Sequence, residues 1–476
     1  MTPSDDKIKV AIVGTGMAGL ATGYLLRQDE LQRFSVTLFE KGDRISLDAA
    51  SVTLVDERDG TCSRVDLPMR AFAGGFYRNL IVMYDHLGIR YHAKRFLFAF
   101  SDVTARLYGG RNDKEKSPSL SGADSPPHFI HSSNNHLIVP VRPPGAHAIG
   151  HLLEVVFVLA CYVWYSLCCF LARPRAGESY GAYLRRMRVP QRFVRRYMAP
   201  LMSSVATCSH EELLAFPASD LTRYQREIFA ADHFVVSHGV QDVAAVLSEG
   251  QDIRLASEVL LVEPCGSRVR LVWIQGPGED VVEEFFGRIV LAIDPCAVAK
   301  VYAPLRSVMP RMPTRIVASA VLHGAGQSTT LRVAERSFKQ NDTVGVDALV
   351  ADTLLLRSDF KGSGCTEALH TVNCGAVVAT SIAGGFGELN VLHRAAFWRV
   401  LRTPDSQEIV NSVLRNRDGT NGPRDYVGWH NGDDGVWLAG GWCWDGMVLL
   451  EGCIVSAVRV AQDFGVRIPW HSEAEH

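Results

Sequence analysis

The sequence predicts an α/β fold in which one domain is assembled from separate stretches of chain and an α+β domain is interleaved between them. Three observations carry this prediction. Residues 7–30 read as a buried strand, a glycine turn and a helix, residues 34–40 as a second strand ending in an acid, and residues 435–463 as a strand, a glycine turn and an apolar helix. At 476 residues the chain also exceeds what one hydrophobic core usually organises, so two domains are expected.

The composition is that of an ordinary globular protein, with 47% hydrophobic and 21% charged residues. Its 49 basic and 51 acidic side chains give no overall attraction to nucleic acid, so any charge-driven binding must be local. Eleven cysteines between Cys62 and Cys453 form no CxxC pair, which indicates free thiols in a reducing compartment and no metal site. The polar N-terminus does not resemble a secretory signal, so we expect a protein that is not secreted and faces the cytosol.

The glycine turn in residues 7–30 has the spacing of a phosphate-binding loop. Gly14 permits a tight turn, Gly16 lets the backbone approach a pyrophosphate, and Gly19 lets the helix pack closely on the strand. The helix begins with Met17 and Ala18, whose free amides and positive dipole end would face the phosphates. These residues predict a Rossmann unit that binds a dinucleotide.

The second strand, Phe34 to Phe39, ends in Glu40, which is followed by Lys41. An acid at this position accepts hydrogen bonds from the adenosine ribose hydroxyls and argues against a 2′-phosphate on the ligand. The motif does not by itself distinguish FAD from NAD. The C-terminal segment makes that distinction.

Residues 435–463 contain a strand ending in Ala439-Gly440, a further Gly441, a short loop, and a helix that opens with Glu451-Gly452. This pattern resembles the closing segment of the amine-oxidase-like flavoproteins, the superfamily of monoamine oxidase, protoporphyrinogen oxidase and phytoene desaturase. Residues 65–89, 256–264 and 287–295 also resemble segments of that superfamily, in the same order along the chain.

The resemblance implies that the chain binds FAD. Gly440 and Gly441 would then lie beside the flavin, and Val259 beside the adenine. Amides near Val448, Leu449 and Leu450 would stabilise negative charge on the pyrimidine edge of the reduced ring. Residues 396–418, where monoamine oxidases carry the cysteine that tethers the flavin, contain no cysteine, so non-covalent FAD is expected.

One stretch departs from the superfamily pattern. Family members carry Gly-Gly shortly after the acid of the second strand, whereas this chain has Arg44-Ile45-Ser46-Leu47-Asp48. Larger residues there oppose close approach of the backbone to the FAD phosphates. This feature favours a rival interpretation, in which the chain is a non-catalytic membrane-associated flavoprotein or scaffold.

The resemblance also implies a division into domains. We expect the FAD domain to comprise residues 1–82, 231–300 and 427–465, and the substrate domain to comprise residues 83–230 and 301–426. Residues 109–127 are rich in Ser, Pro, Gly and charge, and predict a flexible surface insertion.

Residues 152–171 are apolar except for Glu154 and are long enough to span a bilayer. The stretch that follows, residues 173–200, is rich in arginine: Arg173, Arg175, Arg185, Arg186, Arg188, Arg192, Arg195 and Arg196. An apolar helix beside basic residues favours peripheral or monotopic attachment of 152–200 to an anionic membrane surface. A buried helix is the alternative, while a single crossing conflicts with binding one FAD by both ends of the chain.

In flavin reactions the protein mainly binds and orients the flavin and the substrate, so a catalytic triad is not required. The sequence contains no such triad. Trp442 and Trp444 resemble the aromatic pair that flanks the substrate in family members, with packing as the alternative role for each. His430 and Asp445 are candidate proton-transfer groups.

These features predict an FAD-dependent oxidoreductase. It would move hydride from a hydrophobic substrate, such as an acyl chain, an isoprenoid or a polyketide, to flavin N5. Oxygen or a membrane acceptor would then reoxidise the flavin. A redox-neutral alkene isomerase and the non-catalytic flavoprotein remain the alternatives.

Overall fold

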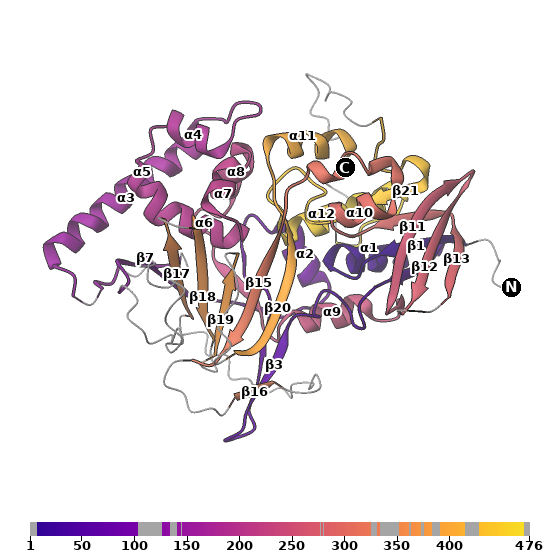
Figure 1. The fold of residues 1–476 in the computed structure, drawn as a ribbon, viewed down its shortest axis with the longest axis horizontal. Coiled ribbons are helices and arrows are strands. Elements are labelled where there is room, and N and C mark those ends of the chain that lie inside the picture. Colours follow the sequence, from indigo (N-terminus) through magenta and orange to yellow (C-terminus); the bar gives the residue numbers. More distant parts are fainter. Residues whose placement is uncertain are drawn as a thin grey trace, which may run out of the picture.

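The computed structural model of the chain describes residues 7–102, 126–133, 140–143, 145–276, 278, 280–324, 331–333, 352–360, 363–372, 376–382, 391–414 and 428–470. Most of the predicted insertion 109–127 lies outside these residues. Within them the fold is the predicted mixed α/β type. Figure 1 shows a sheet with its helices on the right and a second sheet with a helical cluster on the left.

The first sheet is parallel throughout, in the order β10-β2-β1-β14-β21. Its strands are β1 Ile8–Val13, β2 Phe34–Phe39, β10 Asp252–Arg254, β14 Arg288–Leu291 and β21 Val436–Leu438. The helices α1 Met17–Arg27, α12 Leu450–Asp463, α9 Val240–Ser248 and α2 Arg78–His86 accompany it. Residues 10–13 are at most 7% exposed, as the continuous apolar run of a strand covered on both faces requires.

Parallel order brings the carboxyl ends of these strands to one edge of the sheet, where Rossmann folds bind their ligands. Backbone hydrogen bonds continue across that edge, from Gly14 N to Phe39 O (2.8 Å) and from Ala292 N to Val13 O (2.8 Å). Ala439 N likewise donates to Leu291 O (3.1 Å). The start of the chain and its C-terminal segment therefore meet at the same edge, as predicted.

A second, seven-stranded sheet has the order β20-β15-β19-β18-β17-β7-β8. Its strands are β7 Phe96–Asp102, β8 Phe129–Ser132, β15 Thr314–Leu322, β17 Asp352–Asp359, β18 Cys365–Thr371, β19 Val377–Ser381 and β20 Val391–Val400. Beside it lie α3 Ala148–Leu171, α4 Tyr180–Arg186, α5 Gln191–Phe193, a π-helical turn Val194–Met198, α6 Ala199–Ala206, α7 His210–Ala215 and α8 Ala218–Glu227. All strands of this sheet come from residues 83–230 and 301–426.

Smaller elements connect the two halves. A meander packs beside the first sheet: β11 Ser257–Cys265, β12 Arg268–Gln275 and β13 Val281–Phe286, followed by α10 Pro295–Val301. Two further three-stranded sheets consist of β3 Val52–Asp56, β4 Cys62–Val65 and β16 Leu331–Val333, and of β5 Phe72–Ala73, β9 His233–Val236 and β6 Tyr91–Ala93. Helix α11, Pro404–Val413, lies above β20 in Figure 1.

The apolar segment predicted at 152–171 is part of the single 24-residue helix α3. It is the one helix among the described residues that is long and apolar enough to cross a membrane, judged by length and composition only. Only 28% of its most apolar stretch is buried in the fold. The alternative of a buried core helix is therefore wrong: α3 lies on the surface.

Candidate nucleotide-binding site

The three glycines of the turn serve different purposes. Gly14 has φ +101°, and a Cβ there would lie 2.6 Å from the Ala292 carbonyl oxygen. A Cβ on Gly19 would lie 2.0 Å from the Gly14 carbonyl oxygen, so Gly19 is required for the close packing of α1 on β1. A Cβ on Gly16 would meet no atom within 4 Å. The turn therefore keeps open the space beside Gly16, which a pyrophosphate needs.

The N-terminus of α1 faces this open space. Gly16 is the N-cap residue and has no side chain that could cap the first amides of the helix. Uncapped amides combine with the positive end of the helix dipole to attract an anion. These residues fit the phosphate-binding role that the sequence predicts for them.

Glu40 lies at the carboxyl end of β2 and is 6% exposed. One carboxylate oxygen accepts hydrogen bonds from Thr15 N (3.1 Å) and Thr15 Oγ1 (2.7 Å), and the other from Gly42 N (2.9 Å). A carboxylate offers about four acceptor positions, so one is left for a ribose hydroxyl. The neighbouring Lys41 is exposed.

The predicted adenine contact lies close to this acid. Ser257 N donates to the Glu40 carbonyl oxygen (2.7 Å), and Ala256 N to the Gly42 carbonyl oxygen (2.8 Å). These bonds hold the start of β11 against the end of β2, and Val259 follows two residues later, 8% exposed. The contact itself stays a prediction.

The departure at residues 44–48 has a structural consequence. Ser46 N donates to Thr15 Oγ1 (2.9 Å) and Leu47 N to the Thr15 carbonyl oxygen (3.2 Å). Both amides are therefore engaged with the glycine turn instead of pointing toward a phosphate. Phosphate binding must depend on α1 and on charges from elsewhere in the chain.

Those charges come from two arginines that sequence reasoning missed. Arg70 donates through Nη2 to the Leu47 carbonyl oxygen (3.3 Å), and its buried Nε has no partner. Arg399, on β20, donates through Nε to the Ala206 carbonyl oxygen (3.0 Å). Neither forms an ion pair with a described residue, and burial lowers the pKa of Arg399. Arg399 is buried without an ion pair, which makes it a candidate partner for an anion, and Arg70, which also acts on the carboxylate of Asp66, lies near enough to add its charge.

Cys453, in the first turn of α12, shows where that anion would lie. The backbone amides of Ala18 and Gly441 lie against its thiol, and the positive charges of Arg70 and Arg399 act on it. Burial outweighs these influences and raises the pKa of Cys453 to about 11. Residues from the N-terminus of α1 and from the closing segment therefore contact this thiol of α12, and both arginines lie near enough to act on it. This arrangement would suit the phosphates of a dinucleotide.

The closing segment is positioned by hydrogen bonds to α12. Gly440 N donates to Ser456 Oγ (2.9 Å), which in turn donates to the Gly440 carbonyl oxygen (3.2 Å). Leu449 N donates to the Met447 carbonyl oxygen (2.8 Å), so this amide does not face a flavin, contrary to our expectation. The helix begins at Leu450. The predicted stabilisation of a flavin edge would then fall to the amides of Val448 and Leu450.

Glu451 has a structural task in the closing segment. It is 3% exposed and accepts hydrogen bonds from Asn79 N (3.0 Å), Asn79 Nδ2 (2.7 Å) and Leu80 N (3.1 Å). Burial raises its pKa. The carboxylate thus satisfies amides at the N-terminus of α2 and ties that helix to α12.

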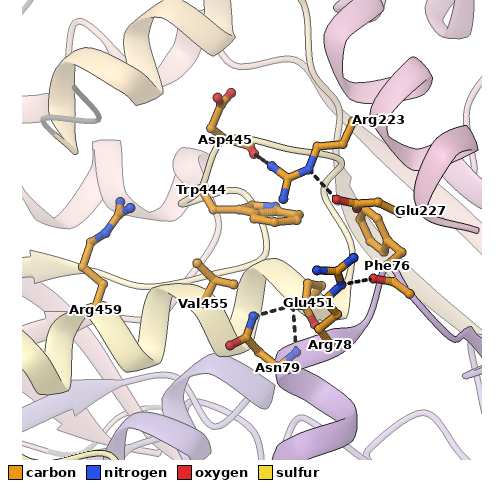
Figure 2. A pocket seen from close by; sticks show the side chains of 11 residues that line it. Phe76, Arg78, Asn79, Arg223, Glu227, Trp444, Asp445, Glu451, Val455 and Arg459 are labelled. Carbon is orange, nitrogen blue, oxygen red and sulfur yellow. Dashed lines mark hydrogen bonds and ion pairs between the residues drawn. The ribbon is translucent and has the colours of Figure 1, made fainter. Parts of the chain in front are cut away.

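A cleft of about 280 Å³ opens between α2, α8 and α12 (Figure 2). Trp444 and Asp445 line it, and the guanidinium of Arg223 lies 5.5 Å from the centre of the Trp444 ring. Arg223 also pairs with Glu227 (3.0 Å). The volume is just below the range of about 300–1,000 Å³ for drug-sized ligands, so the cleft suits part of a substrate and not a whole dinucleotide.

The four predicted catalytic residues are not brought together. Trp442 and Trp444 belong to different hydrophobic clusters, and their indole nitrogens donate to the carbonyl oxygens of Ile293 (3.1 Å) and Met447 (2.9 Å). They therefore do not form a facing aromatic pair. His430 lies outside the cleft lining, 3.5 Å from Asp433. Catalytic roles for His430 and Asp445 stay predictions.

The closing loop is fastened by a residue that the sequence did not single out. Arg402 is 2% exposed and donates to the carbonyl oxygens of Trp444 (2.6 Å) and Trp442 (2.6 Å). Gln407 Nε2 lies between Asp220 Oδ1 and Asp445 Oδ1, 2.9 Å from each. Burial raises the pKa of Asp220 to about 7.

Asp220 makes the stability of this loop depend on pH. Because its pKa is raised in the folded protein, the folded state binds more protons than the unfolded state between about pH 4 and pH 7, and stability falls as pH rises through that window. Across this window the free energy of unfolding of the wild type should fall by up to about 4 kcal/mol more than that of Asp220→Asn. Urea denaturation of both proteins at several pH values in this window measures the difference. If the free energy of unfolding changes with pH equally in both proteins, Asp220 is not the group responsible.

Fold and site together define a protein with a Rossmann-type nucleotide-binding domain, and comparison with known proteins agrees. A family model described as an NAD(P)-binding Rossmann-like domain matches residues 12–87. The chain is similar to the crystal structure of a CLA-producing fatty acid isomerase from P. acnes, with 10% identity, a TM-score of 0.61 and coverage of 97% of this chain and 100% of that one.

It is also similar to cyclohexylamine oxidase from Brevibacterium oxydans IH-35A, with 13% identity, a TM-score of 0.53 and coverage of 96% of this chain and 100% of that one. A search of curated protein sequences finds no match. At these identities the likeness is one of fold. The chain shares its fold with these two solved structures, and the family model agrees with the Rossmann unit that its motifs predicted.

Proposed function

We propose that the chain binds FAD non-covalently and acts as an FAD-dependent oxidoreductase on a hydrophobic substrate. The observation that carries this proposal is that the N-terminus of α1, the closing segment and the charges of Arg70 and Arg399 all act on one site, at Cys453 in the first turn of α12. Separate parts of the chain supply positive charge to one place, as the pyrophosphate of a large dinucleotide requires.

FAD suits this site better than NAD because the C-terminal segment closes over it. FAD, when bound, supplies the hydride acceptor. The chain's own contributions are binding and orientation: Glu40 would hold the ribose, the amides of Val448 and Leu450 would face the pyrimidine edge, and Arg402 would keep the closing loop in place. The cleft beside Trp444 would hold part of the substrate near this loop.

A redox-neutral isomerase is the second candidate. The fatty acid isomerase structure is similar over 97% of this chain and has a higher TM-score than the amine oxidase, 0.61 against 0.53. The same flavin site would serve both reactions. Reduction of the bound flavin by substrate without oxygen favours the oxidoreductase, whereas turnover without net reduction favours the isomerase.

The absorption spectrum of the purified protein tests the proposal first. We expect the spectrum of bound oxidised flavin, and bleaching when a substrate is added without oxygen. A colourless protein that takes up no FAD would overturn it and favour the non-catalytic alternative. Spectra recorded after adding FAD to the apoprotein separate a lost cofactor from a site that cannot bind one.

We further expect heat or acid denaturation to release all of the flavin. Cys453 is the described thiol nearest the converging amides, and its raised pKa keeps it a protonated thiol, which is a poor nucleophile. Absorbance of the supernatant after precipitation measures the release. Flavin that stays with the polypeptide, found by mass spectrometry on the Cys453 peptide, would contradict this expectation.

A further inference from the structure

The exposed face of α3 is unusual for a soluble protein. Apolar side chains recur at three- and four-residue intervals along it, including Ile149, Leu153, Val156, Val163, Leu167 and Phe170, which are 47–72% exposed. At 1.5 Å per residue the helix is about 36 Å long. An apolar stripe of this length exceeds the scattered surface residues that need no explanation, and it indicates an interaction site.

The opposite face of α3 is fixed to the body of the protein. Tyr180 OH donates to Tyr165 OH (2.8 Å), Tyr183 OH to the Cys168 carbonyl oxygen (2.8 Å), and Gln225 Nε2 to Tyr162 OH (3.1 Å). These bonds join α3 to α4 and α8. Lipid cannot surround a helix held in this way, so α3 does not cross a bilayer alone.

Exposed arginines lie on the segment that follows α3 and packs beside it. The side chains of Arg173, Arg175, Arg185, Arg188 and Arg195 are exposed, and none forms an ion pair with a described residue. The one acid of the helix, Glu154, is neutralised by Arg192 and accepts a hydrogen bond from Tyr197 OH. Figure 1 shows α3 at the left end of the molecule, with α4 and α5 beside it.

We propose that this face docks the protein on an anionic lipid bilayer, with α3 lying in the plane of the interface and the five arginines contacting lipid headgroups. Charge decides between a bilayer and a second copy of the chain. Two copies meeting through α3 would bring their arginine groups together, whereas anionic headgroups neutralise them. Trp164 fits this position, because it is 48% exposed and its indole nitrogen donates to the Met187 carbonyl oxygen (2.9 Å). The inference does not depend on the proposed flavin chemistry.

Co-sedimentation with vesicles tests the proposal. The wild type should bind phosphatidylcholine vesicles that contain phosphatidylserine, and salt should weaken the binding only in part, because screening acts on charges and not on buried apolar surface. Replacing the five unpaired arginines by Gln should weaken binding at low salt by about 100-fold or more, because each arginine that reaches the surface contributes to binding anionic lipid. A control that removes two exposed arginines elsewhere, Arg268→Gln with Arg306→Gln, should bind as the wild type does.

A second variant, with Gln at Leu153, Val156, Val163 and Leu167, should lose the part of the binding that resists salt. These side chains are exposed, so the fold should tolerate the change, and circular dichroism checks this. No binding at any salt concentration by a wild type that is monodisperse without detergent would overturn the proposal. A wild-type dimer that this variant converts to a monomer would overturn it in favour of a second copy.

Discussion

Gly16→Val should leave the protein folded and reduce its affinity for FAD by about 100-fold or more, which corresponds to about 2.7 kcal/mol. The variant should fold because a Cβ at this position meets no protein atom within 4 Å and the backbone φ is −69°. Affinity should fall because the valine side chain fills the space that the pyrophosphate must enter. Titration of apoprotein with FAD, followed by flavin fluorescence, measures the effect.

Two further glycine variants test whether the loss of FAD affinity is specific to Gly16. Gly150→Val makes the same change at an exposed position of α3, where the nearest atom is 3.9 Å away, and should leave FAD affinity unchanged. Gly19→Ala should instead lower stability, because its Cβ would lie 2.0 Å from the Gly14 carbonyl oxygen. A Gly16→Val protein with wild-type FAD affinity would show that the ligand does not bind at this turn.

Arg402→Met should destabilise the protein by about 3–5 kcal/mol and loosen the closing loop. The substitution leaves the Trp442 and Trp444 carbonyl oxygens without their donor, and it removes the cation whose charge lowers the pKa of the buried Asp220. Urea denaturation measures the loss, and FAD titration of the protein that remains folded measures the effect on the site.

Arg311→Met is the matched control for this variant. Arg311 is 44% exposed and pairs with Asp405 at 2.6 Å, and an exposed pair contributes only about 0–1 kcal/mol. Arg402→Lys should recover little, since an ammonium cannot reproduce two parallel donors from one planar group. An Arg402→Met protein as stable as the control would show that the loop is held by other contacts.

The Rossmann unit and its glycine turn were largely predictable from the sequence, whereas the placement of the predicted catalytic residues was not. A phosphate-binding turn requires particular residue types at fixed short spacing, which is why the sequence indicated Gly14, Gly16, Gly19 and Glu40. The structure shows a different reason for glycine at each of the three glycine positions. Trp442 and Trp444, although two residues apart, pack into different hydrophobic clusters, and their role beside the substrate stays a prediction. Proximity in sequence does not decide which core an aromatic ring enters.

The sequence by itself determined the features that depend on local backbone geometry and on short patterns. These are the strand-turn-helix at each end of the chain, the acid after β2, and an apolar helix next to a run of arginines. Only the tertiary structure decided which face of α3 is exposed, that Arg402 holds the closing loop, and that the charges of Arg70 and Arg399 both act on Cys453. The physical reason is that burial and pairing of charge depend on contacts between residues far apart in the chain, which no local spacing encodes.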